Sequence, residues 1–159
     1  MAAMSDAMLA RLKAVPLFHS VEAGGLSDLA SRALRRRMDA GELVFREGAP
    51  ADAFYVVLSG SVRIFTHDAT GKEVVLDTKK AGDYFGEMML DHRPRSASIV
   101  TLEPSEFAVI ERREFSAFIA AHPQAAEQLI LHLIRLTRGM NDRVKQYVNS
   151  LGDAKAADV

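Results

Sequence analysis

The spacing of apolar residues changes twice along the chain and divides it into three parts. Between residues 8 and 38, apolar side chains recur at steps of three and four, which predicts two N-terminal helices. We expect the first helix to end at Pro16 and the second to cover residues 26–38. The second would close with four arginines, which favours a solvated face and last-turn cations over a nucleic-acid contact (Arg32, Arg35, Arg36 and Arg37).

From residue 39 to 111 the apolar runs become short and are separated by turn residues. This pattern predicts an antiparallel β-sandwich or barrel. Residues Asp68–Lys72 suit a hairpin turn that closes VRIF against EVVL. Glycines between the runs would supply the positive φ angles that the turns require (Gly41, Gly48, Gly60, Gly71 and Gly82).

The third part, residues 112–151, returns to helical spacing. Pro123 suits a first helical turn, and a continuous helix from Pro123 to Leu151 would be about 43 Å long. That length exceeds what one small barrel can cover, so we expect part of the helix to pack on its copy in a homodimer. The alternative is a helix that lies wholly on its own barrel. Residues 152–159 are small and polar, and they predict a disordered tail.

Composition narrows the class of protein. The 159 residues suit one domain over 1–159, and a net charge of −1 gives no overall field for nucleic acid. With no cysteine, thiolate metal sites and disulfides are excluded. We expect a cytoplasmic protein, because no apolar run of membrane length and no signal peptide is visible. The five histidines form no pair at strand spacing, so we expect no metal and no catalytic site.

The most informative segment is GDYFGEMMLDHRPRSAS, residues 82–98. Arg95 stands among small residues and follows Gly86 by nine positions, which suits a guanidinium and backbone amides that hold one phosphate. Glu87 lies beside this phosphate pocket. A carboxylate fits there if it accepts a hydrogen bond from a ribose hydroxyl, and the pair therefore indicates a cyclic nucleotide.

This segment closely resembles the phosphate-binding cassette of the cyclic-nucleotide-binding domain family. The segments Glu42–Phe65 and Leu12–Val21 also resemble the family's first strands and helical entry. The resemblance implies an α+β fold, with an antiparallel β-roll (jelly-roll-like) flanked by N-terminal helices and a long C-terminal helix. It divides the chain into N-terminal helices (8–38), a β-roll (39–111) with its cassette (82–98), C-terminal helices (112–151) and a tail.

The resemblance also assigns roles to residues. Arg95 would pair with the cyclic phosphate, Ser96 would donate to it, and Glu87 would bind the 2′-hydroxyl. The C-terminal helix would place Met140 and Asn141 near the base. The full predicted ligand site comprises Phe85, Gly86, Glu87, Met88, Arg95, Ser96, Ala97 and Asn141.

One feature departs from the family. Typical members have one or two more residues between the glutamate and the arginine than the seven residues MMLDHRP present here. Either the loop is trimmed without moving its ends, or Arg95 is misaligned with the phosphate. Arg93 is the substitute cation in the second case.

We therefore expect a stand-alone sensor that binds cAMP or cGMP and reports occupancy through its C-terminal helix to a dimer mate or a protein effector. Membrane contact is not expected, nor is direct DNA binding, because the chain ends eight residues after Leu151. Two alternatives stay open. The chain is the ligand-sensing fragment of a transcription regulator, or an adaptor of the same fold that has lost the ligand.

Overall fold

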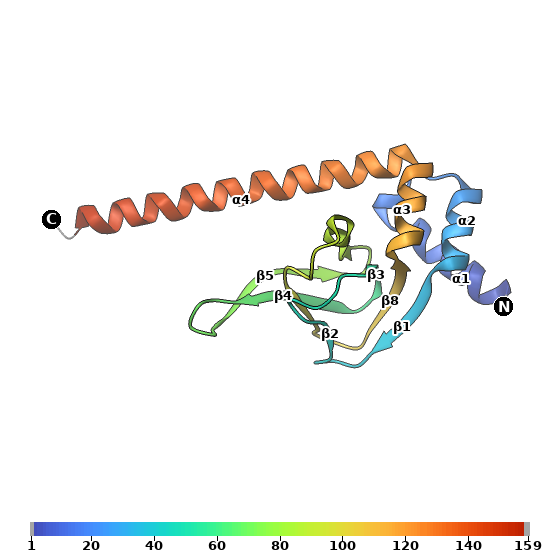
Figure 1. The fold of residues 1–159 in the computed structure, drawn as a ribbon, viewed down its shortest axis with the longest axis horizontal. Coiled ribbons are helices and arrows are strands. Elements are labelled where there is room, and N and C mark those ends of the chain that lie inside the picture. The colour runs from blue at the N-terminus through green and yellow to red at the C-terminus, as the bar shows by residue number, and fades with distance from the viewer. Residues whose placement is uncertain (1, 158–159) are drawn as a thin grey trace.

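The computed structural model describes residues 2–157, and in this part of the chain eight strands form two four-stranded antiparallel sheets (Figure 1). The first sheet has the order β1-β8-β3-β6 and the second β2-β7-β4-β5. The strands are β1 (Leu34–Met38), β2 (Leu43–Phe45), β3 (Ala53–Ser59), β4 (Ser61–His67), β5 (Glu73–Lys80), β6 (Tyr84–Phe85), β7 (Ser98–Thr101) and β8 (Ser105–Glu111).

Helices precede and follow this β-roll, as the sequence predicts. The long C-terminal helix projects well beyond the roll (Figure 1). Among residues 2–157, no helix is both long enough and apolar enough to span a bilayer. The helices are α1 (Ala2–Lys13), α2 (Ala23–Arg32), α3 (Arg112–Ala121) and α4 (Pro123–Ala157), with short 3₁₀ turns η1 (Pro16–Phe18) and η2 (Glu87–Asp91).

Two apolar clusters stabilise the fold. One lies between the helices and the first sheet, where Phe54 of β3 stacks on Phe115 of α3 with ring centroids 4.2 Å apart. The other fills the roll around Val57, Val62 and Phe107, all fully buried. Since the second cluster also contains Phe85, the strand that leads into η2 is held by the core of the roll.

The turn predictions are confirmed. Strand β4 pairs with β5 from Ser61↔Lys80 to His67↔Glu73, and the Asp68 side chain accepts hydrogen bonds from the amides of Thr70 and Lys72 in the turn. Helix α4 begins at Pro123 and is continuous. All five glycines assigned to turns have positive φ (Gly41, Gly48, Gly60, Gly71 and Gly82).

The prediction of a helix over 26–38 is wrong at its C-terminal end. Helix α2 stops at Arg32, Ala33 is extended, and residues 34–38 form β1, paired with β8. Arg35 and Arg37 therefore lie in a strand and not in the last turn of a helix. Both donate hydrogen bonds to Glu106 of β8. The pairing of β1 with β8 and the ion pairs with Glu106 therefore outweigh the local preference of these residues for helix. Glu106 also binds Arg11, which lies 95 residues away in the chain.

The prediction of a disordered tail is also wrong where it can be compared. Helix α4 continues through residues 152–157, and residues 158–159 lie outside the described part. Once a helix is nucleated, each added residue forms one backbone bond, and Ala154, Ala156 and Ala157 are strong helix formers. A composition of small residues therefore extends this helix.

Candidate functional site

A cavity of about 330 Å³ lies between the β-roll and α4. Its buried end is formed by Arg95, only 6% exposed, and by Phe85 and Ala97. Its exposed end is formed by α4, where Met140 is 63% exposed, and by Leu76 of β5. The lining is mainly apolar, which is usual for a site that takes a small organic ligand.

The backbone of Arg95 is pinned to the loop after β2. Its amide donates to the Ala49 carbonyl and its carbonyl accepts from the Gly48 amide, each at 2.8 Å. The side chain then turns inward, and Nη2 donates to the Ala53 carbonyl at 2.8 Å while Nη1 lies 3.4 Å from the Gly86 carbonyl. Within the described residues, Nε of Arg95 has no hydrogen-bond partner.

Burial leaves this guanidinium poorly compensated. It lies 4.0 Å from the centroid of the Phe45 ring, and the nearest carboxylate, that of the exposed Asp52, is 3.8 Å from Nη2. Burial lowers the pKa of Arg95 from its ordinary value, and the fields of Tyr55 and Asp52 oppose this only in part. Arg95 stays protonated, so the buried end of the cavity favours an anion.

Gly86 lets the chain pass close to this arginine. Its φ of 88° lies in the left-handed region, and a Cβ there would come within 2.9 Å of the Ala53 carbonyl and 3.1 Å of Arg95 Nη1. Glu87 follows at the start of η2 and lines the same cavity. Its carboxylate is part-buried and takes part in no ion pair within residues 6–157, so it is available to a ligand.

The shortened loop closes by an unusual backbone conformation. His92 ends η2 with a φ of 60°, a left-handed value uncommon for a residue other than glycine. Its Nδ1 lies 3.0 Å from Nη1 of Arg112, and Nη2 of the same arginine donates to the Ala51 carbonyl. This contact with α3 supports the tight turn.

Comparison with known proteins agrees with this geometry. The family model "Cyclic nucleotide-binding domain" matches residues 35–122, more than half of the chain. The chain belongs to the cyclic nucleotide-binding domain family. This is a binding family rather than one defined by a reaction.

Several relatives of this domain are regulators. A CRP-like cAMP-activated global transcriptional regulator of Mycobacterium tuberculosis is 30% identical over 144 residues, which cover 90% of this chain and 63% of the relative. A cAMP-dependent protein kinase regulatory subunit of Aspergillus fumigatus is 33% identical over 109 residues, covering 68% and 26%. The crystal structure of the Thermus thermophilus catabolite activator protein superposes with a TM-score of 0.75 at 34% identity, covering 82% and 62%. The chain thus spans less than two thirds of each relative.

The structure brings together most of the residues predicted for the cyclic-nucleotide site. Arg95 lines the cavity and Arg93 does not. Ser96 is exposed and its hydroxyl contacts the Met88 sulfur at 3.3 Å. The predicted residues that line the cavity are Phe85, Gly86, Glu87, Met88, Arg95, Ser96 and Ala97.

Asn141 is the exception. It lies in a shallow hollow on another face of α4, beside Ile134, Thr137 and Arg138, and does not line the cavity. The prediction that it faces the base within its own chain is therefore corrected. Helical geometry is the reason, because consecutive residues point about 100° apart, and of these two residues Met140 is the one that lines the cavity.

Sequence reasoning missed several other residues that line the cavity, among them Phe45, Asp77, Lys79 and Arg143. Phe45 carries the contact with the Arg95 guanidinium, although it lies 50 positions away. No local motif marks any of them. A signal was available only for Arg143, which follows Met140 by three positions and so shares its helical face.

Proposed function

We propose that this cavity binds a 3′,5′-cyclic nucleotide and that the chain acts as a sensor of that ligand. The observation that carries the proposal is Arg95, a buried cation at the closed end of an apolar cavity. Its Nε has no partner among the described residues. A cyclic phosphate carries one negative charge and would compensate the guanidinium by a charge-assisted hydrogen bond. Backbone amides beside Gly86 would contact the same phosphate.

The other groups of the cavity fit the rest of the nucleotide. Glu87 is an acceptor next to the phosphate position and would bind the ribose 2′-hydroxyl. Leu76 and Met140 line the exposed end and offer apolar surface for a purine. Arg143 and Asp77 supply a donor set and an acceptor set at this end, so polar groups of either adenine or guanine can be satisfied.

Helix α4 would carry the signal. Near its start Ala125 and Leu129 are buried against the body, whereas Leu136 and Met140 line the cavity farther on. A ligand that contacts these two side chains prefers one position of the helix over others. Only such a preference can shift the population of helix positions.

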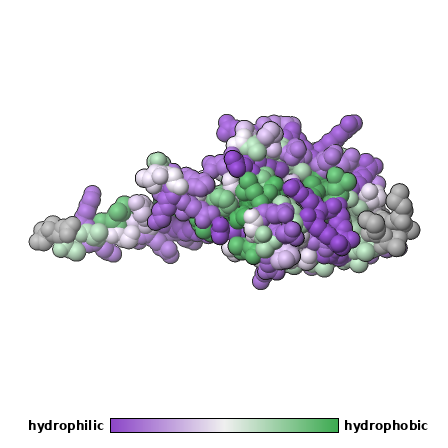
Figure 2. Space-filling view, turned by 90° about the horizontal axis from the view of Figure 1, so that it is seen from below, coloured by the Kyte–Doolittle hydropathy of each residue, from purple (hydrophilic) through white to green (hydrophobic). Residues whose placement is uncertain are grey.

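Another face of α4 supports a homodimer. Steps of four and three residues run without a break along a line that we call the α4 seam: Ile130, Ile134, Thr137, Asn141, Val144, Val148 and Leu151. Three of its apolar side chains are more than half exposed, namely Ile130 (55%), Val144 (61%) and Val148 (57%). Figure 2 shows apolar side chains among polar ones on the projecting part of α4. This is the heptad pattern of a two-stranded coiled coil.

Asn141 then has a role other than base contact. It occupies an a position of the heptad, with β-branched Ile134 and Val148 one heptad away on each side. A single buried asparagine at an a position pairs with its copy and fixes a parallel, in-register dimer at some cost in stability.

Isothermal titration of the purified chain with cAMP and then cGMP tests the sensor function. We expect one site per chain with micromolar or tighter affinity for at least one of them, and the two titrations rank the bases. Folded protein that releases no heat with either nucleotide, and shows no shift in thermal unfolding with either, would reject the proposal.

A further inference from the structure

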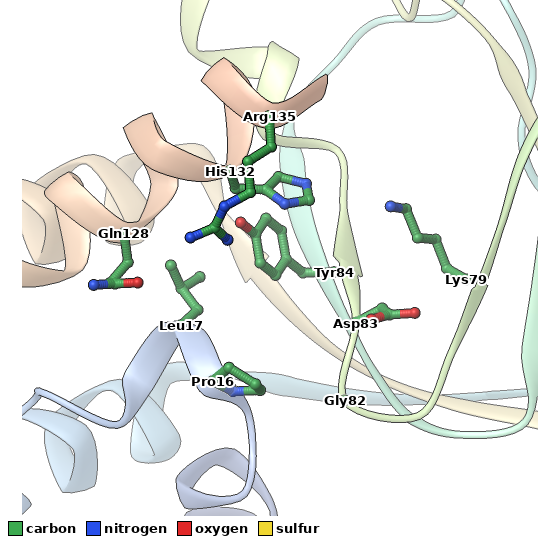
Figure 3. A pocket seen from close by; sticks show the side chains of 9 residues that line it. All are labelled: Pro16, Leu17, Lys79, Gly82, Asp83, Tyr84, Gln128, His132 and Arg135. Carbon is green, nitrogen blue, oxygen red and sulfur yellow. The ribbon is translucent and has the colours of Figure 1, made fainter. Parts of the chain in front are cut away.

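A second hollow lies between η1, the turn from β5 to β6, and α4 (Figure 3). We call it the α4 crevice, and its volume is about 200 Å³. Inside it, the imidazole of His132 packs against the ring of Tyr84, with centroids 5.0 Å apart and planes inclined by 56°. Tyr84 and Lys79 line both this crevice and the nucleotide cavity. The crevice therefore adjoins the proposed ligand site.

Tyr84 also packs on the core of the domain. Its ring packs on Phe54 with centroids 5.3 Å apart, and Phe54 in turn stacks on Phe115 of α3. His132 lies on α4 between the buried Leu129 and the cavity-lining Leu136. The Tyr84–His132 contact is thus placed where α4 leaves the body and begins to cover the cavity.

The charges around His132 disfavour a further cation. Lys79 of β5 is only 14% exposed and pairs with Asp77 at 3.0 Å, and Arg135 of α4 reaches into the crevice next to the Tyr84 hydroxyl (Figure 3). Asp83 lies at the β5–β6 turn, where its carboxylate accepts from the Lys80 amide. From η1 only Pro16 and Leu17 line the crevice, and Gln128 of α4 is neutral.

Burial lowers the pKa of His132, and Lys79 and Arg135 lower it further, against the opposing fields of Glu87 and Asp83. Docking of α4 lowers the pKa of this histidine, so docking is most favourable when the pH is above the ordinary histidine pKa and the imidazole is neutral. That contribution is lost as the pH falls below about 6.5, the ordinary value for histidine. Acidification therefore weakens the packing of α4 on Tyr84.

We propose that His132 is a positioning residue that docks α4 over the nucleotide cavity, and that proton uptake by its imidazole loosens the helix and lowers cyclic-nucleotide affinity. The lowered affinity rests on the proposed function, whereas the docking of α4 does not. Since the docked helix supplies Leu136 and Met140 to the cavity, ligand and proton compete through the position of α4.

The first test compares the wild type with His132→Gln at pH 7.5 and 5.5, by titration with whichever of cAMP and cGMP binds more tightly. We expect the wild type to lose affinity by about fivefold or more at pH 5.5, the low end of common site–site couplings. His132→Gln keeps a planar polar side chain without a titratable group and should lose most of this pH response. His19→Gln, which removes an exposed histidine outside the crevice, should respond like the wild type.

A second readout follows α4 itself and needs no ligand. The chain contains no cysteine, so Ala40→Cys on the β1–β2 turn and Gln146→Cys on α4 can carry two spin labels. Samples are diluted with unlabelled chain, so that only distances within one protomer are measured. Acidification should broaden the distribution of distances between the two labels. When the same label pair is combined with His132→Gln, this distribution should not change with pH.

The two readouts separate failure of this inference from failure of the sensor function. Cyclic-nucleotide binding with the same pH response in wild type and His132→Gln would overturn the inference and leave the sensor intact. A helix that moves with pH through His132, in a protein that binds neither nucleotide, would support the docking role and reject the sensor. A distance distribution that changes neither with pH nor with His132→Gln would overturn the role of His132 in docking α4.

Discussion

Replacement of Arg95 by methionine tests the site most sharply. Methionine keeps the unbranched aliphatic part of the side chain but removes the guanidinium, and with it the charge and the contact over the Phe45 ring. In the complex, the cyclic phosphate would then be buried without its cation. Truncating one partner of a buried charged pair costs about 2–5 kcal/mol, and we expect at least about 3 kcal/mol here, a loss of affinity of roughly 150-fold.

The stability of the unliganded protein should change much less. The bond from Nη2 to the Ala53 carbonyl is lost, which costs about 1–3 kcal/mol for an acceptor left unsatisfied. Removal of a buried cation whose nearest carboxylate is exposed and 3.8 Å away offsets this cost. We expect the free energy of unfolding to change by less than about 2 kcal/mol.

Titration calorimetry measures the affinity, and urea unfolding followed by circular dichroism measures the stability. Arg93→Met is the matched control, because Arg93 belongs to the same loop, is exposed and does not line the cavity. Arg93→Met should bind like the wild type. If a folded Arg95→Met variant binds within threefold of the wild type, the assignment of the phosphate to Arg95 is wrong.

Three further substitutions probe the cassette and α4. Gly86→Ala should destabilise the fold by about 1–2 kcal/mol in urea unfolding and weaken binding, because its Cβ meets the Ala53 carbonyl and Arg95. Gly82→Ala is the control for backbone strain alone, since Gly82 also has a positive φ but open space around it. Equal losses of stability in the two variants would refute the steric clash at Gly86. Glu87→Ala should weaken the binding free energy by about 1.5–3 kcal/mol and abolish the preference for the cyclic nucleotide over its 2′-deoxy form. If the wild type already binds the two forms equally, Glu87 does not bind the 2′-hydroxyl. Asn141→Cys should form a disulfide with the same position of a second chain under mild oxidation, whereas Gln146→Cys, which lies outside the α4 seam, should not. The reverse pattern would exclude a parallel dimer along the α4 seam.

Much of the fold could be predicted from sequence because its determinants are local. The β4–β5 hairpin depends on a turn at Asp68–Lys72 and on alternating runs beside it, and both lie within a few residues of each other. Helix α4 follows from Pro123 and a long apolar repeat. The cassette could be recognised because Gly86, Glu87 and Arg95 form one short motif that resembles the phosphate-binding cassette of the family.

Other features were decided by partners far away in the chain. Residues 34–38 have helical preference, yet β8 and Glu106 draw them into a strand. The burial of Arg95 depends on Phe45 and Ala53, which the roll brings together from its two sheets. Likewise, the rotation of α4 is set by its packing on the body, where Ala125 and Leu129 are buried, and that rotation directs Met140 to the cavity and Asn141 to the seam.

The sequence by itself therefore determined which groups are available for the ligand, since residue types and short spacings are written in it directly. The tertiary structure decided which of these groups meet, how deeply Arg95 is buried and which face of α4 stays exposed. These properties arise from contacts between residues tens of positions apart. Such contacts are set by the free energy of packing the whole roll, and no local pattern records them.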